Sequence, residues 1–517
     1  VPYRGLSERG EKMMRLFIPA AAVAAIAVAA VAGGTTRSAH LDARGSIAPQ
    51  ILQAPGGPVA VQQRWLHASG WSGCTAASGN LHCYLPSDIR EAYGIDQLPE
   101  KGDGQTVVLI DAYGSPAASD ELQAFHDAFF PSEPKPNFDQ VFPLGQPDYK
   151  NANGNGQSGS GAAANWAVEA ALDVQWSYAV APHAHIVLMA VAPAETLGVQ
   201  GFPNLFKAID QAIDTYPAGT VFSMSLATTE STFGGAAATQ TAKFDAVFQK
   251  GIAKGDSFFG ASGDWGTNAL LKQQHKTAVG SNPETFWPST SPYVTSVGGT
   301  QLQFGWTWAP KSDVPFTPTD FNPDYFNSTA GGNLNVVWNE SWLPAATGGG
   351  PSSIYSRPSW QDSVASRIPG DHRGIPDLSW NAAVNGAVLV DLLSFLPADQ
   401  QGFYLIGGTS ASTPQTAALT ALVNQRRGSL GKVPIGNLAP RLYSLPSNAF
   451  VDVAPTHQGD AGVISGDLNS NAMFQYNPDG SVSVGPVAGW PTLTGWDMTT
   501  GFGTPWAPNF VADLAAL

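Results

Sequence analysis

One serine stands among small residues just before an apolar stretch, in the segment Gly407-Gly408-Thr409-Ser410-Ala411-Ser412-Thr413-Pro414. A hydroxyl that attacks a carbonyl must be uncrowded and must lie near backbone N–H donors for the developing oxyanion, and small residues provide both. The residues that follow, 415–423, are typical of a buried helix that would hold Ser410 in place. Ser410 is therefore a candidate nucleophile, although similar strings occur in ordinary loops.

A serine nucleophile needs a base, and the chain offers acids rather than a histidine for that task. None of its nine histidines stands in a His-Gly-x-His segment. Glu169 and Asp173 are four residues apart in the Ala-rich stretch 166–176, so a helix there places both on one face. Two like charges on an apolar helix destabilise it unless a function or a partner holds them there. A solvated acidic face is the alternative, which the apolar flanking residues disfavour.

A third acid, Asp264, follows an apolar strand-like run in a Gly-rich turn. Catalytic groups collect at strand ends in open α/β sheets, whereas an Asp that caps the next turn is the alternative. Asp264 could donate a hydrogen bond to an oxyanion only as the neutral acid, which requires an apolar or charge-crowded site that raises its pKa. Phe258, Phe259 and Trp265 are the neighbours that would exclude water from it.

In the order Glu169, Asp173, Asp264, Ser410, these motifs resemble those of the sedolisins, the serine-carboxyl peptidases. The resemblance runs from about Tyr84 to the C-terminus and includes further segments at 83–95, 287–300, 348–353 and 373–379. It implies that Ser410 is the nucleophile, Glu169 its general base and acid, Asp173 the group that orients Glu169, and Asp264 the oxyanion-hole residue. A Glu with a pKa near its ordinary value of about 4.3 predicts activity at about pH 3 to 5.

Two aspartates near the C-terminus, with Gly-rich backbone between them, suit a hard cation such as Ca²⁺, which takes oxygen ligands that include backbone carbonyls. The resemblance implies one structural Ca²⁺ in this loop region, bound by the side chains of Asp452 and Asp497 and by the carbonyls of Val453, Leu493 and Gly495. Leu493 departs from the glycine usual in the family, and a carbonyl ligand tolerates that change if the backbone conformation is allowed. Two turn aspartates satisfied by local N–H groups are the alternative.

The chain departs from the family pattern in two places. The family commonly has Ser-x-Ser-Trp-Gly along the substrate cleft, and this chain has Ser223-Met224-Ser225-Leu226-Ala227. Sedolisins also usually carry a large folded propeptide, whereas the segment before Tyr84 is short here. The propeptide is expected to be absent or reduced to a remnant, so either the protein matures differently or the segment from His40 to Trp71 is a short leader or linker.

Apolar runs at 104–111, 185–191 and 219–224 predict buried parallel strands, and they alternate with helices expected at 120–130 and 202–214. This pattern predicts an α/β fold, and the resemblance a subtilisin-like, doubly wound parallel sheet with helices on both faces. Residues 151–164 are expected to form a loop before the Glu169 helix, and the Trp-rich stretch 304–342 a surface excursion.

Three segments are expected: a signal peptide over 1–34, with a true start at Met13 or Met14; a short leader or linker over 35–83; and a peptidase domain over 84–517. An uncleaved anchor is the alternative for the first of them, because its apolar run is close to a spanning length. In an exported protein, Cys74 and Cys83 would most simply form a disulfide. A net charge of −15 with 13% charged residues disfavours binding to nucleic acid or anionic membranes.

The sequence thus predicts a secreted, calcium-stabilised, monomeric endopeptidase that hydrolyses protein or peptide substrates at acidic pH through an acyl-enzyme on Ser410. A tripeptidyl-peptidase remains open, because the sequence does not show whether the cleft is closed at one end. A secreted binding protein that keeps the fold without activity is the alternative from another class. An esterase of the α/β-hydrolase kind is disfavoured, because Ser410 is not in a Gly-x-Ser-x-Gly motif.

Overall fold

A computed structural model provides the architecture of the chain. It describes the backbone of residues 48–49 and 52–53 and most of the chain from 83 onward, namely residues 83–147, 149, 160–191, 199, 201–268, 270–273, 276–279, 282–303, 334–340, 345–384, 386–453, 469–476, 482–484 and 487–517. The predicted signal peptide and Cys74 lie outside the described residues. Cys83 is disulfide-bonded, and the chain has one other cysteine.

A central sheet of eight strands organises the fold, in the order β14-β13-β9-β7-β4-β6-β5 with β19 also paired to β13. All of its pairings are parallel except that of β14 with β13. The strands are β4 (Thr106–Ala112), β5 (Asn137–Val141), β6 (His185–Val191), β7 (Val221–Met224), β9 (Ser257–Ala261), β13 (Thr295–Gln303), β14 (Leu334–Val337) and β19 (Leu378–Asn381).

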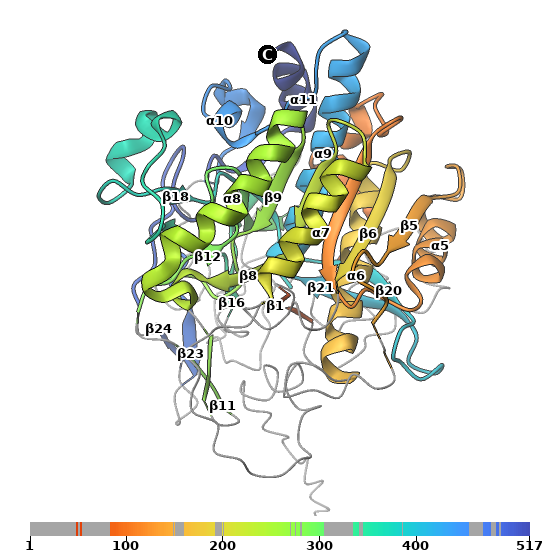
Figure 1. Cartoon of the computed structure of the whole chain (residues 1–517), viewed down its shortest axis with the longest axis horizontal. Helices are drawn as coiled ribbons and strands as arrows, with labels where there is room; N and C mark the ends of the chain where they lie inside the picture. Colours follow the sequence, from red (N-terminus) through yellow and green to blue (C-terminus); the bar gives the residue numbers. More distant parts are fainter. Residues whose placement is uncertain are drawn as a thin grey trace, which may run out of the picture.

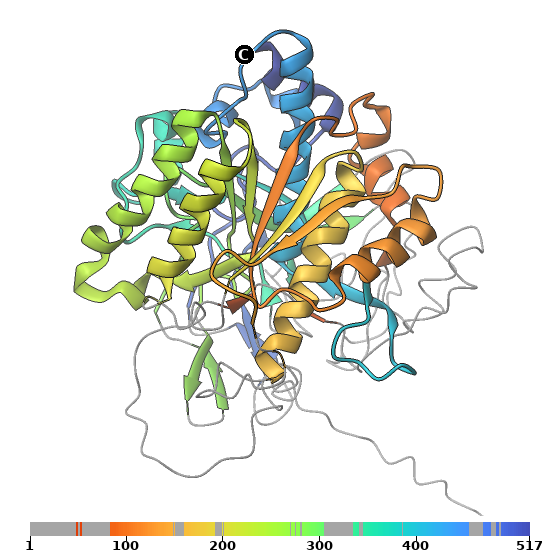
Figure 2. The same ribbon diagram turned by 45° about the vertical axis from the view of Figure 1, so that its right-hand side comes forward.

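Helices cover both faces of this sheet, as Figures 1 and 2 show. Alternation along β4 explains the two layers, because successive side chains of a strand point to opposite faces. Val107 and Leu109 belong to one buried apolar cluster and Val108 and Ile110 to the other. The first cluster includes α5 (Ala118–Phe129), α6 (Ser160–Val180), α9 (Thr409–Ser429) and α11 (Ala507–Ala516); the second includes α7 (Phe202–Thr215) and α8 (Ala237–Lys254). The predicted fold class is confirmed.

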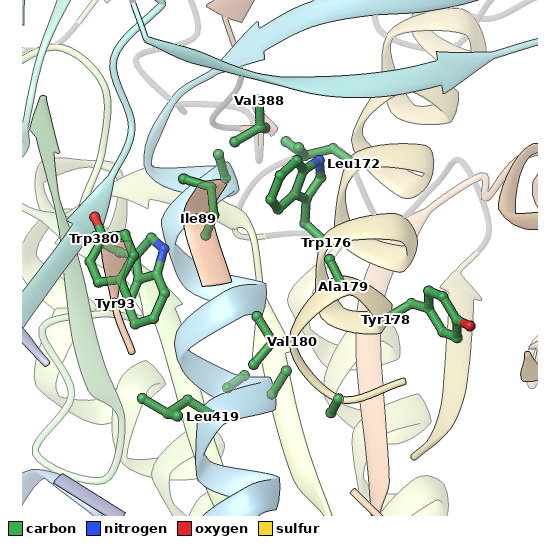
Figure 3. Packing of buried hydrophobic residues seen from close by; sticks show 14 of the residues in the cluster. Ile89, Tyr93, Leu172, Trp176, Tyr178, Ala179, Val180, Trp380, Val388 and Leu419 are labelled. Atoms are coloured by element: carbon green, nitrogen blue, oxygen red, sulfur yellow. The ribbon is translucent and has the colours of Figure 1, made fainter. Parts of the chain in front are cut away.

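Helix α6 is fixed against a second, smaller sheet, as the side chains in Figure 3 show. The order of this sheet is β2 (Leu52–Gln53), β21 (Gly402–Gly407), β20 (Ala387–Leu392) and β3 (Cys83–Tyr84). Trp176 of α6 is fully buried, and its indole N–H donates to the carbonyl of Leu389 at 2.8 Å. Gln175 forms two hydrogen bonds with the backbone of Asp391. Rotation of α6 is thereby restricted, so residues on its other faces have defined directions.

Helix α9 lies in the middle of the molecule, where it contacts α6, α11 and five strands of the central sheet. Its residues 409–424 are all buried, and many are small, which lets neighbouring elements approach closely. The helix begins directly after Gly408, whose φ of 106° is available to glycine at little cost. The sequence therefore provides both the sharp turn into α9 and the close packing around its first residues.

Two loop predictions need correction. Helix α6 begins at Ser160, so the last five residues of the loop expected at 151–164 are helical. The Trp-rich excursion predicted at 304–342 ends in β14 and β15 (Asn339–Glu340), and Trp338 between them is fully buried. Part of that stretch therefore forms an edge strand of the central sheet and is not a surface loop. Among the described residues, no helix combines the length and apolar character needed to cross a bilayer.

Candidate active site

The four predicted catalytic residues come from three elements that meet at one end of the central sheet. Glu169 and Asp173 are one turn apart in α6, Asp264 lies three residues after β9, and Ser410 is the second residue of α9. All four have no exposed surface. Since α6 and α9 pack directly against each other, the spacing in sequence becomes a single site in space.

Ser410 lies close to the strand that continues from β7. Its Oγ donates to the carbonyl oxygen of Ser225 at 3.4 Å, a long hydrogen bond that a better acceptor can replace. The hydroxyl of Ser225 in turn donates to Asp173 Oδ1 at 2.9 Å. Ser225 belongs to the altered cleft segment, but it is one of the two serines that match the family pattern. It therefore links the nucleophile region with the acids of α6.

A further acid, Asp111, joins this site and was not predicted. It lies near the C-terminal end of β4, is fully buried, and has one carboxylate oxygen within 4.8 Å of one from each of Glu169 and Asp173. Such a group could hold a metal ion or share protons. The signal in the sequence was the same one that identified Asp264, an acid at the end of an apolar strand of a parallel sheet.

Few hydrogen bonds satisfy these acids. Both oxygens of Asp111, both of Glu169 and Oδ2 of Asp173 are buried and accept no hydrogen bond within the described structure. An ionised carboxylate without partners is costly to bury, so most of these groups must be protonated in the folded protein. The three acids therefore hold several protons close to the hydroxyl of Ser410.

Burial is the main cause that raises the pKa of each acid. The pKa of Glu169 lies well above its ordinary value because of burial, then of Asp173 and Asp111, while the Ser410 hydroxyl acts in the opposite direction. Burial and then Asp111 raise the pKa of Asp173 in the same way, and burial raises the pKa of Asp111 to about 8. The expectation that Glu169 keeps a near-ordinary pKa is thus wrong, since a fully dry site and two acidic neighbours were not visible in the sequence.

Asp264 is held by the residue before the serine. Its Oδ1 accepts hydrogen bonds from the backbone N–H and the hydroxyl of Thr409, both at 2.8 Å. Its Oδ2 is buried and has no partner in the described structure. Burial raises the pKa of Asp264 to about 7, so below that pH Oδ2 can carry a proton with no internal acceptor. This is the protonation state that hydrogen-bond donation requires.

These pKa shifts predict that the protein is most stable in acid. A carboxyl with a raised folded-state pKa binds its proton more tightly when folded, so stability falls as pH rises from about 4, where unfolded acids ionise, to about 8. We expect the urea midpoint to decrease across that range. The Asp111→Asn variant, which has no proton to lose there, should lose less stability; an equal decrease in both proteins would contradict this cause.

The predicted calcium ligands come together in one loop region. The N–H of Gly495 donates to Asp452 Oδ2, and that of Leu493 to Asp497 Oδ2, each at 2.7 Å. Gly495 has a φ of 73°, which explains a glycine at this position. Asp497 Oδ1 accepts from the backbone and hydroxyls of Thr499 and Thr500, so one of its oxygens is already fully used.

The side chain of Arg367 also stabilises this loop. Arg367 donates to the carbonyls of Thr494 at 2.8 Å and Trp496 at 2.5 Å, and it opposes the burial that raises the pKa of Asp452. The carbonyls of Leu493 and Gly495 are not among its acceptors. The donor set, two carboxylates with backbone carbonyls, therefore suits a hard cation.

A parallel α/β sheet with a serine at a helix start and buried acids beside it is the arrangement of the subtilisin-like fold class. The family model for the subtilases matches residues 121–438, more than half of the chain. Within that group the chain belongs to the sedolisin family, the serine-carboxyl peptidases.

Similar proteins support this placement. Kumamolisin of Bacillus sp. (strain MN-32) is 28% identical over 433 residues, which are 82% of this chain and 62% of kumamolisin. Tripeptidyl-peptidase 1 of Mus musculus is 30% identical over 275 residues, 52% of this chain and 39% of that protein. The chain thus spans less than two thirds of the length of these relatives. The fold resembles that of Pseudomonas sedolisin with a TM-score of 0.60 at 24% identity, over 85% of this chain and 99% of that structure.

Proposed function

We propose that this chain is an acid-active endopeptidase in which Ser410 is the nucleophile and Glu169 its general base and acid. The observation that carries the proposal is the placement of a buried serine, at the start of a rigid helix, beside acids several of whose buried oxygens accept no hydrogen bond from the described residues. Membership in a family of serine peptidases supports it. The substrates would be proteins or peptides.

Each acid has a distinct task in this proposal. Glu169 takes the proton of Ser410 as its Oγ attacks the substrate carbonyl, and then gives it to the leaving amine. Asp173, fixed by the hydroxyl of Ser225, orients Glu169 from one turn away. Asp111 acts through Glu169 and Asp173, because a negative charge on Asp111 raises the pKa of both. It is a positioning residue rather than a catalytic one.

Asp264 would stabilise the oxyanion as a neutral acid. Thr409 holds one oxygen, which leaves Oδ2 free to donate to the charge that develops on the substrate. The reaction needs one ionised carboxylate at Glu169 together with a protonated Asp264. The four acids meet this condition when they have lost one proton and Glu169 is the group that has lost it, and the loss of the proton of Asp264 ends it.

This condition predicts cleavage restricted to acid. We expect the protein to hydrolyse a denatured protein substrate in acid and to lose this activity as the pH approaches about 7, where Asp264 ionises. The measurement is peptide release across about pH 2.5 to 8, with the Ser410→Ala variant as background. Folded protein that releases no more peptide than this variant at every pH would instead favour a non-catalytic binding protein.

A single structural Ca²⁺ and secretion complete the proposal. Asp452 and Asp497 with the carbonyls of Val453, Leu493 and Gly495 would hold the ion, which would tie the loop at Gly495 to the strand end at Asp452. The apolar N-terminal run supports export, with no lasting membrane attachment once the signal peptide is removed, and we expect a monomer.

Calcium should therefore raise thermal stability. Saturation at about one hundred times Kd contributes about 2.7 kcal/mol to the folded state. We expect a lower Tm in EGTA than in millimolar calcium, and no such difference in the Asp452→Asn variant. Equal Tm values for the unmodified protein in both buffers would rule out a stabilising ion, and Arg367 alone would then hold the loop.

A further inference from the structure

One phenylalanine combines two features that the stability of the fold does not explain. Phe395 is 39% exposed, whereas the next residue, Leu396, packs against a buried apolar cluster. The φ of Phe395 is 62°, in the left-handed region that residues other than Gly, Asn and Asp rarely adopt. Such strain is typically kept at sites that bind a ligand, because there it serves a function. An exposed ring gains little from burial, so Gly or Asn would suit this position better if only stability mattered.

Phe395 lies in the turn between β20 and β21, and that turn is fixed to the first turn of α5. Glu121 of α5 is fully buried and accepts the backbone N–H groups of Leu393 at 2.9 Å and Ser394 at 2.8 Å. The side chain of Gln401 closes the turn by donating to the carbonyl of Leu393 at 3.1 Å. The position of Phe395 is therefore well defined although its ring is exposed.

A second aromatic residue connects Phe395 with the end of β4. The ring of Tyr149 meets that of Phe395 edge to face, with 5.9 Å between the ring centres and 66° between the planes. The hydroxyl of Tyr149 donates to the carbonyl of Tyr113 at 2.6 Å, and Tyr113 stands two residues after Asp111. Among the described residues, Tyr113 and Phe395 are the two with a positive φ that are not glycine. Both strained positions thus belong to one unit that reaches from the acid cluster to the turn.

This aromatic unit lies within reach of a peptide bound at Ser410. Strand β21 leads from the turn to Gly407, three residues before Ser410. Figure 1 shows the turn between β20 and β21 at the lower right, at the end of the molecule where α6 begins. Six residues of an extended chain span about 20 Å. A substrate in extended conformation therefore brings a residue to Phe395 when that residue is about six positions from the cleaved bond.

We propose that Phe395 and Tyr149 form a distal subsite that binds an aromatic or large aliphatic side chain of the peptide substrate. The proposal rests on the proposed peptidase function and deepens it, because it names a preference of the same site. An aromatic side chain can pack against the exposed part of the Phe395 ring, and such ring pairs stabilise a complex beyond the area that they bury. Because the turn holds the ring in place before the substrate arrives, binding orders few further groups.

The test compares peptides that share the residues around the cleaved bond and differ about six positions away, where one peptide has Phe and the other Ser. One pair is extended before the cleaved bond and a second pair after it. In acid, the unmodified protein should have a KM about three to ten times lower for the Phe peptide in at least one pair, with kcat unchanged. In Phe395→Gly and in Phe395→Asn the two KM values should become nearly equal.

Thermal stability distinguishes a ligand contact from a structural one. Gly and Asn adopt a positive φ more easily than Phe does, so both variants should have a Tm at least equal to that of the unmodified protein. Leu430→Asn is the matched control, because Leu430 is 58% exposed and follows the other end of α9 from Ser410; it should keep the preference for Phe. A clearly lower Tm in both Phe395 variants, or a preference that survives in them, would overturn the subsite.

The same peptides separate the two proposals. If the protein cuts both members of each pair with equal KM, the subsite is wrong and the peptidase function stands. If the folded protein cuts none of them, both proposals fail together. A preference for Phe that both Phe395 variants lose supports both.

Discussion

Replacement of Ser410 by Ala should lower kcat/KM for an acid-cleaved peptide by about 10⁴-fold or more, and Glu169→Gln should cost about as much. Without Ser410 no acyl-enzyme forms, and without the carboxylate of Glu169 the hydroxyl keeps its proton in a site that has no exposed surface. Because the two groups act as one unit, the double variant should be no worse than either single one. Steady-state kinetics at the optimal pH would measure all three.

The folding of these variants is the natural control. Both substitutions are close in size to the original side chains, and Glu169→Gln removes an acid whose pKa is raised mainly by burial. We therefore expect the variants to be at least as stable as the unmodified protein at neutral pH. If Glu169→Gln kept most of the activity while folded, another group would be the base, and Asp111 would be the first to consider.

Replacement of Arg373 by Met should destabilise the protein by about 3 to 5 kcal/mol, because it leaves a buried carboxylate without its cation. Arg373 and Asp377 are both fully buried and form an ion pair of 2.6 Å. Asp377 also accepts the N–H of Ser296 and the hydroxyl of Tyr443, each at 2.9 Å. The guanidinium lies over the ring of Trp360, 4.8 Å from its centre. The pair thus joins strand β13 to the loop before β19.

Urea unfolding at neutral pH would measure this loss. The matched control is Arg357→Met, because Arg357 pairs with the mostly exposed Asp362 at 3.3 Å and such pairs contribute at most about 1 kcal/mol. A loss from Arg373→Met that is no larger than that from Arg357→Met would contradict the expected cost of leaving the buried carboxylate without its cation.

Local patterns in the sequence predicted much of the fold. The run 185–191 is β6 as expected, and the helices expected at 120–130 and 202–214 are α5 and α7, displaced by at most two residues at an end. The sequence patterns of buried strands and of amphipathic helices involve only residues near one another in the chain, which explains why these elements could be predicted. The four predicted catalytic residues, which stood in three separate motifs of the sequence, also come together in the structure.

The remaining features depend on contacts between distant residues. Asp111 stood at the end of a predicted strand, but only the pairing of β4 with β6 and β7 brings it to α6. The pairing of β1 (Ala48–Pro49) with β8 (Leu226–Thr229) and of β2 with β21 involves two residues each, far too few for a periodic pattern. Likewise, nothing around Arg373 in the sequence reveals that it is buried with Asp377, although both stand in one segment similar to the family.

The central position of α9 affects how well this helix resists digestion by other copies of the protein. A chain segment must open before another molecule can cut it, and segments that fray easily are cut first. Residues 409–424 of α9 are buried and touch elements from both ends of the described chain, so this helix cannot open without disruption of the whole core. Attack by neighbouring copies is therefore confined to the periphery, and the element that carries the nucleophile would be the last to be digested.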